Sequence, residues 1–528
     1  MNRIITSLIA CALPLLLVST VSLSNAARPF NKNQSWNVKY SIEPELRVLD
    51  EVVRSDHPSQ LFGFNINFKQ FQKQLWTKDQ LPKTGIVEAL QPFEGAIYRY
   101  PGGLVANSFH WKASVGPVVS RTAQTSFFQK SPAKVRFGLE EYLQFVDDVS
   151  GQPWYVLNIV GTDLVSPLKV SPKDEMAYSN LNLAKYLAEN LDKKYFPMRL
   201  QLGNELDRSK YEWLGEKYAR RAKSVMDIIK ANRLEDEFEF VNFMRDFTWT
   251  YRRDTKLGRS NPKDYLKEVI DTMGVTNDYS LHHYYDGNRI DGNSRAIPFW
   301  LRHLSRSIDD HLDITGEPAS IWITEHGRQP NSKKAGTDGS EAFTSNVSAA
   351  LSTSDYLISL TQFAEVKGAV WHGLNAGPWQ LFDYSVKHRD LRPRPIYWAL
   401  RVLRMVSMDE VLRTFTYSPN NSEYAGGYDI RGTAFRTKDE NQFGLRLVNR
   451  APAAQKIKVK YELFTEQKVS YKQYSLSLKD GQDPDVERDD FIVEIEPAAQ
   501  TDQFDDKGYI SIELPASSVS SIVMQKSS

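Results

Sequence analysis

Short apolar segments alternate with longer amphipathic segments between about residue 60 and residue 374. Eight of the short segments have the length and the residue content of buried strands. They are Phe62–Phe68, Ala96–Tyr100, Trp154–Val160, Arg199–Glu205, Phe238–Phe243, Tyr279–Tyr285, Ser320–His326 and Ala369–Leu374. Helical periodicity lies between them, for example over Leu139–Val146, Tyr211–Asn232, Pro262–Met273, Phe299–Leu312 and Val347–Leu360. Such alternation is typical of the α/β class with a parallel sheet, and eight units predict a closed (β/α)8 TIM barrel.

An open, doubly wound sheet is the alternative to a barrel. Such a sheet usually carries a glycine-rich phosphate-binding loop after its first strand. The segment Asn65-Ile66-Asn67-Phe68 stands at that place here and contains no glycine. The barrel is therefore the favoured architecture.

The pattern changes after about residue 408, where short alternating strands follow one another with no helix between them. They are Phe443–Asn449, Lys456–Phe464, Phe491–Ile495, Tyr509–Leu514 and Ser518–Met524. This pattern predicts an appended antiparallel β-sandwich. An early strand near Trp36–Val48 precedes the barrel and is expected to join the sandwich. We therefore expect a linker and strand over residues 27–58, the barrel over 59–407 and the sandwich over 408–528.

The first 26 residues are typical of an export signal that is removed from the mature protein. Met1-Asn2-Arg3 is a short basic start, an apolar stretch follows from Ile4 to Leu23, and Ser24-Asn25-Ala26 offers small residues to a signal peptidase. We expect cleavage after Ala26 and a secreted or periplasmic protein. A lipoprotein attached through Cys11 is the alternative, although only a short apolar stretch would precede that cysteine.

Composition excludes several classes of function. Cys11 is the only cysteine and is lost with the signal peptide, so disulfides and thiol catalysis are excluded. Lys plus Arg is 66 and Asp plus Glu is 65, which gives no electrostatic case for binding nucleic acid or an anionic membrane. No later run approaches the ~20 apolar residues of a membrane span. The acidic stretch Asp480–Asp490 could hold calcium, but it lacks the spaced ligands of a dedicated calcium loop, so a solvated loop is favoured and no metal site is expected.

Two glutamates stand at the ends of predicted barrel strands. Glu205 ends the fourth strand within Leu202-Gly203-Asn204-Glu205, and Glu325 lies near the end of the seventh within Thr324-Glu325-His326-Gly327. Strand ends of a barrel meet at one mouth, so both carboxylates are expected to face one pocket. Two carboxylates are what glycosidic bond cleavage needs, one as proton donor and one as nucleophile or base. Glu205 is the expected acid/base and Glu325 the expected nucleophile.

Other strand ends carry side chains that suit a sugar site. Asn204 is placed to hydrogen-bond a sugar 2-hydroxyl beside Glu205. Arg99 precedes Pro101-Gly102-Gly103, whose glycines allow the backbone to approach a ligand closely. On the sixth strand, His282 and Tyr284 share one face, and the tyrosine hydroxyl is expected to keep Glu325 ionised. Trp371 on the eighth strand is a candidate platform for a sugar ring.

Each of these residues has an ordinary structural role when it is considered alone. An Asn-Glu pair is common, a barrel arginine is usually an ion-pair partner, and a strand-end tryptophan often belongs to the core. The joint pattern is more informative, because the signals fall at the ends of the second, fourth, sixth, seventh and eighth strands. Their coincidence favours an active site.

These motifs resemble those of the clan-A glycoside hydrolases. Leu202-Gly203-Asn204-Glu205 is similar to the acid/base motif of that clan, and Thr324-Glu325 is similar to its nucleophile motif. Arg99-Tyr100-Pro101-Gly102-Gly103 with Trp111, and the closing Leu514-Pro515-Ala516-Ser517-Ser518-Val519, resemble the α-L-arabinofuranosidases. Leu281-His282-His283-Tyr284-Tyr285 resembles both that group and the heparanase-like β-glucuronidases. The resemblance implies a retaining hydrolase of plant or algal polysaccharide or oligosaccharide that needs no cofactor.

One departure bears on the substrate. The arabinofuranosidases commonly have a sugar-binding glutamate in a Gly-x-Phe-x-Glu pattern after the first strand, and here Asn65 and Asn67 occupy the informative places. Both asparagines are therefore candidate substrate-binding residues. The alternatives in the same clan are a β-glucuronidase, a β-xylosidase and an agarase-like galactan hydrolase. A non-catalytic exported carbohydrate-binding protein is the alternative outside enzymes.

Overall fold

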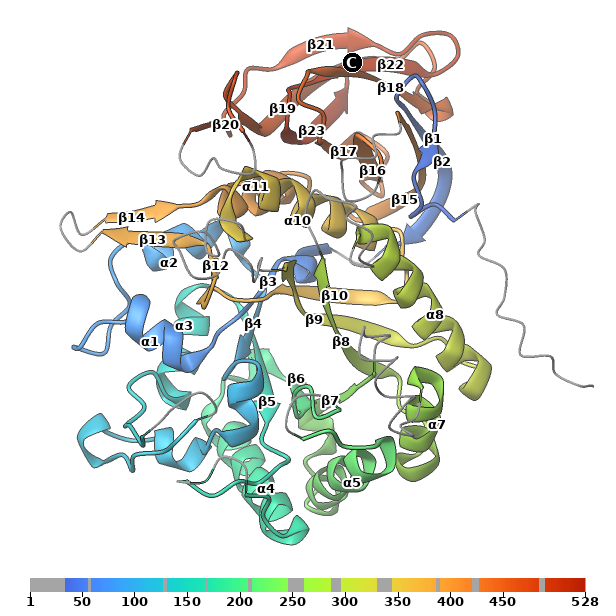
Figure 1. Cartoon of the computed structure of the whole chain (residues 1–528). Coiled ribbons are helices and arrows are strands. Elements are labelled where there is room, and N and C mark those ends of the chain that lie inside the picture. Colours follow the sequence, from blue (N-terminus) through green and yellow to red (C-terminus); the bar gives the residue numbers. More distant parts are fainter. Residues whose placement is uncertain are drawn as a thin grey trace, which may run out of the picture. The chain divides into compact units, whose positions relative to one another are not determined.

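Strands β3 to β10 close into a parallel barrel in the order β10-β3-β4-β5-β6-β7-β8-β9 (Figure 1). Each strand lies on one of the eight predicted segments, and every neighbouring pair is parallel. The strands are β3 (Gly63–Asn65), β4 (Ile97–Tyr100), β5 (Gln152–Leu157), β6 (Met198–Leu202), β7 (Phe238–Phe243), β8 (Asp278–Tyr285), β9 (Ser320–Arg328) and β10 (Val366–Trp371). The predicted (β/α)8 barrel is confirmed.

The computed structural model describes residues 34–55, 58–126, 131–164, 166, 169–207, 211–245, 261–285, 296–329, 344–385, 390–419, 427–483 and 490–527. The predicted signal peptide, with Cys11 and Ala26, lies outside these residues. Within them, no helix is long and apolar enough to cross a membrane.

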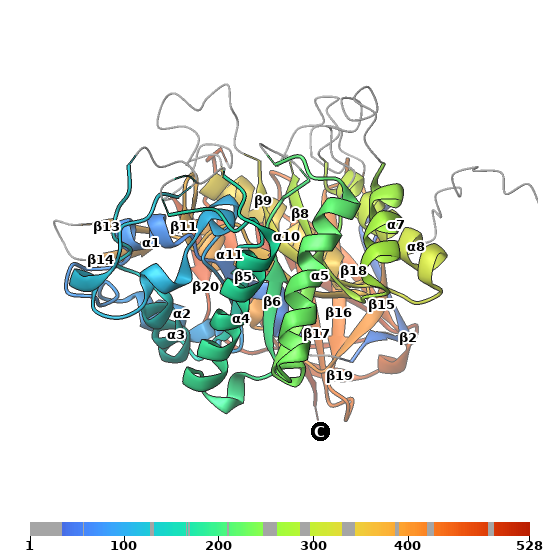
Figure 2. The same ribbon diagram turned by 90° about the horizontal axis from the view of Figure 1, so that it is seen from below.

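Helices surround the barrel, and α4 and α5 pack side by side on its outside (Figure 2). The α-helices are α1 (Phe68–Gln74), α2 (Ile86–Leu90), α3 (Leu139–Asp148), α4 (Lys173–Asn190), α5 (Gly215–Ala231), α7 (Pro262–Met273), α8 (Ile297–Thr315), α10 (Val347–Leu360) and α11 (Pro395–Arg404). Local signals set their ends. Asn261 caps α7 by accepting from the Asp264 amide, and α8 ends at Gly316, whose φ of 81° suits glycine.

Short 3₁₀ helices connect these elements. They are η1 (Pro58–Phe62), η2 (Gln91–Phe93), η3 (Leu104–Ser108), η4 (Trp111–Ser114), η5 (Val118–Ser120), η6 (Lys193–Tyr195), η7 (Glu235–Glu237) and η8 (Glu462–Phe464). Two small hairpins precede α11, β11 (Asn375–Ala376) with β12 (Trp379–Gln380) and β13 (Phe382–Ser385) with β14 (Asp390–Pro393). Helices η3 and η4 matter most here, because they follow β4 at the mouth of the barrel.

A second sheet of eleven strands combines strands that follow the barrel with two that precede it, in line with the appended sheet and early strand that the sequence pattern predicts. Its strands are β1 (Lys39–Tyr40), β2 (Glu45–Arg54), β15 (Glu410–Ser418), β16 (Ile430–Arg436), β17 (Gln442–Asn449), β18 (Gln455–Tyr461), β19 (Lys468–Leu478), β20 (Phe491–Glu494), β21 (Gln500–Gln503), β22 (Tyr509–Leu514) and β23 (Ser518–Lys526). Most pairs are antiparallel, whereas β1–β15 and β2–β18 are parallel. The strands surround a core that includes Leu46, Phe443, Ile457, Ile510 and Ile522.

Strand β2 makes this a single hydrogen-bonded sheet. It pairs with β15 on one side and with β18 on the other, and so joins strands that would otherwise belong to two layers. The appended antiparallel sheet is confirmed, but as one sheet that folds around its core. The boundaries predicted at residues 59 and 408 stay predictions.

Helix α10 is buried along its whole length, because β9 lies against it on the barrel side and β16, β17 and β23 lie against it on the other. Asp355 at its centre is the focus of what we call the Asp355 cluster, which comprises Asp355, Tyr428, Arg431 and Arg450. The Asp355 carboxylate accepts from Arg450 Nη2 at 2.6 Å, from the Tyr428 hydroxyl at 2.8 Å and from Arg431 Nε. The cluster fixes the barrel helix to the sheet.

Candidate active site

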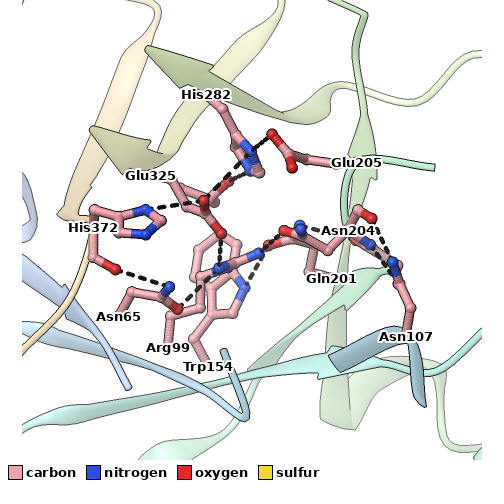
Figure 3. A network of polar contacts seen from close by, with 12 residues as sticks. Asn65, Arg99, Asn107, Trp154, Gln201, Asn204, Glu205, His282, Glu325 and His372 are labelled. Atoms are coloured by element: carbon pink, nitrogen blue, oxygen red, sulfur yellow. Dashed lines mark hydrogen bonds and ion pairs between the residues drawn. The ribbon is translucent and has the colours of Figure 1, made fainter. Parts of the chain in front are cut away.

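The two glutamates predicted to be catalytic lie together at the mouth of the barrel (Figure 3). Glu325 is on β9 with a side chain that is 3 % exposed, and Glu205 follows the end of β6 with a side chain that is 13 % exposed. One oxygen of each carboxylate lies within 4.8 Å of the other, with a ring nitrogen of His282 in the same group. The two carboxylates therefore face one another at the mouth of the barrel.

Arg99 on β4 is wholly buried and holds the base of this site together (Figure 3). Its Nη1 donates to Glu325 Oε1 at 3.0 Å and to Asn65 Oδ1 at 2.9 Å. Its Nε donates to Gln201 Oε1 at 2.8 Å, and its Nη2 to Asn204 Oδ1 at 2.6 Å. The guanidinium thus connects β3, β6 and β9, and four of its five N–H groups donate to protein groups.

The backbone that carries Glu205 is held from a second direction. Asn107 in η3 donates from Nδ2 to the Asn204 carbonyl at 2.6 Å and accepts from the Asn204 amide at 3.0 Å. Glu205 itself has φ of 47°, a left-handed conformation that costs a residue with a side chain about 1–2 kcal/mol. The paired amide of Asn107 stabilises the turn that presents this carboxylate.

The second oxygen of Glu325 is surrounded by groups that can carry or share protons. The Tyr284 hydroxyl donates to Glu325 Oε2, and His372 Nδ1 lies 3.1 Å from the same oxygen and 2.7 Å from the Tyr284 hydroxyl. Burial by itself raises the pKa of the Glu325 carboxyl. Electrostatic interactions with His282, His372 and Arg99, together with the hydrogen bond to His372, outweigh burial and hold that pKa well below its ordinary value of 4.5. Glu325 is therefore ionised at neutral pH.

His282 lies between the two carboxylates. Its Nδ1 is 3.0 Å from Glu205 Oε1 and 3.8 Å from Glu325 Oε2, while its Nε2 lies 3.1 Å from Thr324 Oγ1. The sequence predicts His282 on the strand next to Glu325, and the two residues are register partners across β8 and β9. The contact with Glu205 was not predicted.

The glycines after β4 let the backbone approach the site. A β-carbon on Gly103 would lie 2.7 Å from Glu325 Oε1, closer than real contacts allow. Gly102 has φ of 130°, and a β-carbon there would lie 3.0 Å from the Asn67 α-carbon. The expected close approach is present, and it brings the chain against the Glu325 carboxylate.

The remaining predicted site residues divide. Asn65 belongs to the network, because it accepts from Arg99 and its Nδ2 donates to the His372 carbonyl at 3.0 Å. Asn67 instead caps α1, with Oδ1 accepting from the Lys69 and Gln70 amides. Trp371 is only 1 % exposed and offers no free ring face. Its role as a sugar platform is therefore not supported.

Several participants were not among the predicted site residues. Trp379 is half-buried and has its ring 3.9 Å from that of His372 and 5.7 Å from that of Tyr284. The sequence could have indicated Gln201 as a site residue, since a glutamine inside an apolar strand is unusual. Asn107 gave no signal, because nothing in its neighbourhood indicates that it reaches β6. His372 stands directly after Trp371 in the sequence. The prediction named Trp371, whereas the side chain that contacts Glu325 is that of His372.

The described residues offer one group with the donor atoms of a metal site, Glu205, His282 and Glu325. The 3.0 Å between His282 Nδ1 and Glu205 Oε1 is a hydrogen-bonding distance. The arrangement is accounted for by hydrogen bonds among its members.

Comparison with known proteins supports the resemblance noted in the sequence. Residues 89–206 match the family model of the α-L-arabinofuranosidase 1 domain, a stretch that contains Arg99, Asn107, Gln201 and Glu205. An intracellular exo-α-(1→5)-L-arabinofuranosidase of Streptomyces lividans is 31 % identical over 125 residues, which cover 23 % of this chain and 19 % of that protein. A probable α-L-arabinofuranosidase C of Aspergillus niger is 27 % identical over 124 residues, covering 23 % and 24 %. The match thus spans about a fifth to a quarter of these relatives.

Solved structures match over a much longer stretch. The α-L-arabinofuranosidase of Thermotoga maritima, solved with arabinose, has a TM-score of 0.68 at 15 % identity and covers 92 % of this chain and 100 % of its own. A family 51 α-L-arabinofuranosidase of Bifidobacterium longum has a TM-score of 0.69 at 14 % identity, covering 91 % and 100 %. The chain therefore resembles the clan-A α-L-arabinofuranosidases, over residues 89–206 in sequence and over nine tenths of its length in fold.

Proposed function

We propose that this protein is a retaining glycoside hydrolase in which Glu325 is the nucleophile and Glu205 the acid/base. The observation that carries the proposal is the pair of carboxylates with oxygens within 4.8 Å across one barrel mouth. Retaining enzymes have carboxyl groups roughly 5–5.5 Å apart, whereas inverting enzymes leave room for a water between them. The unequal surroundings of the two carboxylates support unequal roles.

In the first step, a Glu325 oxygen attacks the anomeric carbon while Glu205 gives its proton to the departing glycosidic oxygen. The bond to the leaving group breaks, and a covalent glycosyl ester forms on Glu325. In the second step, Glu205 takes a proton from water, the water oxygen attacks the anomeric carbon, and Glu325 leaves as a carboxylate. Two inversions give net retention.

The contacts of Glu325 suit the nucleophile. An attacking carboxylate must be ionised, and the lowered pKa of Glu325 meets that requirement. The Tyr284 hydroxyl and Arg99 hold one oxygen each, so the carboxylate presents a fixed orientation. Glu205 is partly buried beside the His282 ring, and it is more accessible than Glu325 to solvent water, which the second step requires.

Asn204 supports recognition of the sugar. Its Oδ1 is taken by Arg99, while its buried Nδ2 has no hydrogen-bond partner among the described residues. A buried donor without a partner is costly, and a substrate hydroxyl would satisfy it. The position directly before Glu205 suits the 2-hydroxyl of the sugar under attack, as the sequence predicted.

We propose an α-L-arabinofuranoside as the first substrate class to test, within plant or algal polysaccharide or oligosaccharide. The likeness to arabinofuranosidases supports it. The asparagines at positions 65 and 67 keep β-xylosidase and agarase-like activities as alternatives. A β-glucuronidase is less well supported, because Arg99 is wholly buried and four of its five N–H groups already donate to protein groups.

We also propose that the protein is exported, secreted or periplasmic, with cleavage after Ala26. The basic start, apolar stretch and small residues of the first 26 positions support this. The mass of the mature protein recovered outside the cytoplasm tests it, since a chain beginning at Ala27 is expected. A lipid-modified chain beginning at Cys11 would favour the lipoprotein alternative.

The direct test of catalysis replaces each glutamate by glutamine and adds azide with an activated aryl arabinofuranoside. Azide should rescue Glu325→Gln and Glu205→Gln with products of opposite anomeric configuration. Glu141→Gln is a matched control, because Glu141 pairs with Arg121 at 2.7 Å outside the site. Full activity of either site variant would refute the assignment. Sugar binding by calorimetry with no sugar released by the wild type would instead favour a carbohydrate-binding protein.

A further inference from the structure

A cavity of about 200 Å³ lies outside the catalytic pair, between the end of β5, helix α4 and the segment after η3. Phe109, His110 and Trp111 form one wall, and Asn158 and Thr162 follow β5 on another. Exposed residues of α4, Glu175 and Ser179, mark the side that faces solvent. Its volume suits a single sugar ring rather than a long ligand, which would need roughly 300 Å³ or more.

Two residues that line the cavity carry a buried polar atom without a hydrogen-bond partner among the described residues. Thr162 is 3 % exposed, and its Oγ1 has no hydrogen-bond partner among the described residues. His110 Nε2 also has no partner by distance among the described residues, although the His110 side chain interacts with the backbone of Asp163. Unsatisfied buried polar atoms are rare and costly, so their presence on a cavity wall indicates a hydroxylated ligand or ordered water. Aromatic residues beside them supply the apolar surface that the carbon face of a sugar needs.

The lining carries little charge. Burial lowers the pKa of His110, so its imidazole is neutral at neutral pH. Among the described residues that line the cavity, Glu175 is the one carboxylate, and it stands at the exposed side. The same set contains no lysine or arginine, so a uronate or a sulfated sugar would find no counter-charge there. The chemistry fits a neutral sugar.

Two segments that line the cavity are neighbours, in the chain, of residues that hold the acid/base side of the catalytic pair. Phe109 lies two residues after Asn107, which holds both backbone groups of Asn204. From the other wall, Ile159 follows Asn158 and packs against Gly203, so that a β-carbon on Gly203 would lie 3.0 Å from Ile159 Cγ1. Each of the two wall segments therefore adjoins a residue that contacts Asn204 or Gly203, directly before Glu205.

The side of the catalytic pair on which the cavity lies determines which part of the substrate it would bind. Glu205 protonates the leaving oxygen in the proposed mechanism, so the leaving part of the substrate lies on its side of the pair. Strand β5 neighbours β6, which carries Glu205, and lies away from β9, which carries Glu325. A chain that leaves over Glu205 runs toward β5 and α4.

We propose that the cavity lined by His110, Trp111, Asn158 and Thr162 binds one neutral sugar unit on the leaving-group side of the cleaved bond. The location on the leaving-group side rests on the proposed glycosidase function, whereas sugar binding itself does not. The Thr162 hydroxyl and the His110 ring are the polar contacts, and the Trp111 ring is the apolar one. The protein then prefers an oligosaccharide over a single glycoside with a simple leaving group.

The test compares Thr162→Val with Thr162→Ser and Thr125→Val. Valine keeps the shape of threonine and removes the hydroxyl, whereas serine keeps the hydroxyl. Thr125 is the matched control, because its buried Oγ1 also lacks a partner among the described residues but it does not line the cavity. The substrates are 1,5-linked arabinotriose, xylotriose and the corresponding aryl monoglycosides.

The measured quantity is kcat/KM for the trisaccharide divided by kcat/KM for the aryl glycoside. Thr162→Val should lower this ratio roughly three- to tenfold, as expected for one lost hydrogen bond, while Thr162→Ser and Thr125→Val keep it. A general folding defect would lower both numbers and leave the ratio unchanged. An unchanged ratio in Thr162→Val overturns the proposal.

The same variants separate this proposal from the proposed function. If the wild type hydrolyses none of the substrates, the proposed arabinofuranosidase activity and the xylosidase alternative fail, and calorimetry with the two trisaccharides still tests the cavity. Binding that Thr162→Val weakens and Thr125→Val preserves supports a sugar site. Equal binding by all variants, or no binding by the wild type, overturns it.

Discussion

Two buried arginine–carboxylate groups in this protein have similar parts and different consequences. At the barrel mouth, Arg99 holds Glu325, and between barrel and sheet, Arg431 and Arg450 hold Asp355. Asp355 is surrounded by two arginines, whose charge does not change, and by Tyr428. Glu325 has one arginine, and its other oxygen meets groups that exchange protons. A permanent ion pair stabilises the fold, whereas a carboxylate with exchangeable neighbours and a second carboxylate nearby is suited to chemistry.

The largest expected effect comes from Glu325→Gln. If Glu325 is the nucleophile, kcat should fall by at least about 10⁴-fold, as for other variants that lose an acting nucleophile. The free energy of unfolding should change less than in variants of Asp355, because glutamine keeps hydrogen-bonding capacity and Arg99 keeps three other acceptors. Steady-state kinetics and urea unfolding measure the two quantities. A stable variant with wild-type kcat would show that the group formed by Arg99 and Glu325 is no more catalytic than the Asp355 cluster.

Asp355→Asn should have the converse effect. It leaves two buried guanidinium groups without a carboxylate, which typically costs about 3–5 kcal/mol of unfolding free energy. The kcat of the folded fraction should stay unchanged, since the cluster does not touch the site. Asp227→Asn is the control, because Asp227 pairs with Lys223 on the surface, where such pairs contribute about 0–1 kcal/mol. Loss of kcat at unchanged stability would show that the Asp355 cluster is not merely structural.

Tyr284→Phe tests the role of the hydrogen bond from the Tyr284 hydroxyl to Glu325 Oε2. Hydrogen bonds to charged groups contribute about 1.5–3 kcal/mol, so kcat should fall roughly ten- to a hundredfold if Tyr284 orients the nucleophile. Tyr285→Phe is the matched control on the next position of β8. The Tyr285 hydroxyl bonds Thr353 at 3.2 Å and does not contact Glu325. A loss of activity as large in Tyr285→Phe would point to a general effect of β8.

The smallest effect concerns pH. The pKa of Glu325 is depressed in the folded protein, so its ionised form contributes stability above the unfolded pKa of 4.5. That contribution is lost as pH falls through the folded value. The difference in unfolding free energy between wild type and Glu325→Gln should therefore narrow below pH 4.5. Urea titrations at a series of acidic pH values measure it. A difference that widens toward acidic pH would show that the pKa of Glu325 is raised, not lowered, in the folded protein.

Sequence patterns predicted the elements of this protein better than the directions of its side chains. The eight strands were predictable because buried parallel strands are apolar throughout, and β7 has the bounds that were expected. Glu205 and Glu325 were predictable because each interrupts such a pattern at its end. His282 pairs with Glu325 across β8 and β9 as expected, but its contact with Glu205 was not predicted, because the residues do not show how the chain turns after β6.

The asparagines illustrate the same limit. Asn65 and Asn67 are chemically identical and two positions apart, yet one joins the Arg99 network and the other caps α1. Which role each takes depends on where α1 begins, and helix ends are poorly determined by local pattern. Asn107 could not be found at all, because its contact with Asn204 joins segments 97 residues apart.

Strand β2 has a consequence for how the chain folds. Its antiparallel partner β15 begins about 360 residues later, and its parallel partner β18 later still. During synthesis from the N-terminus, β2 emerges before the barrel and has no partner until the barrel is complete. Unpaired strand edges are sites of aggregation, and pairings between distant segments form slowly. A chain interrupted before residue 461 would leave one edge of β2 unpaired. The sheet can therefore be completed only after the whole barrel has been synthesised.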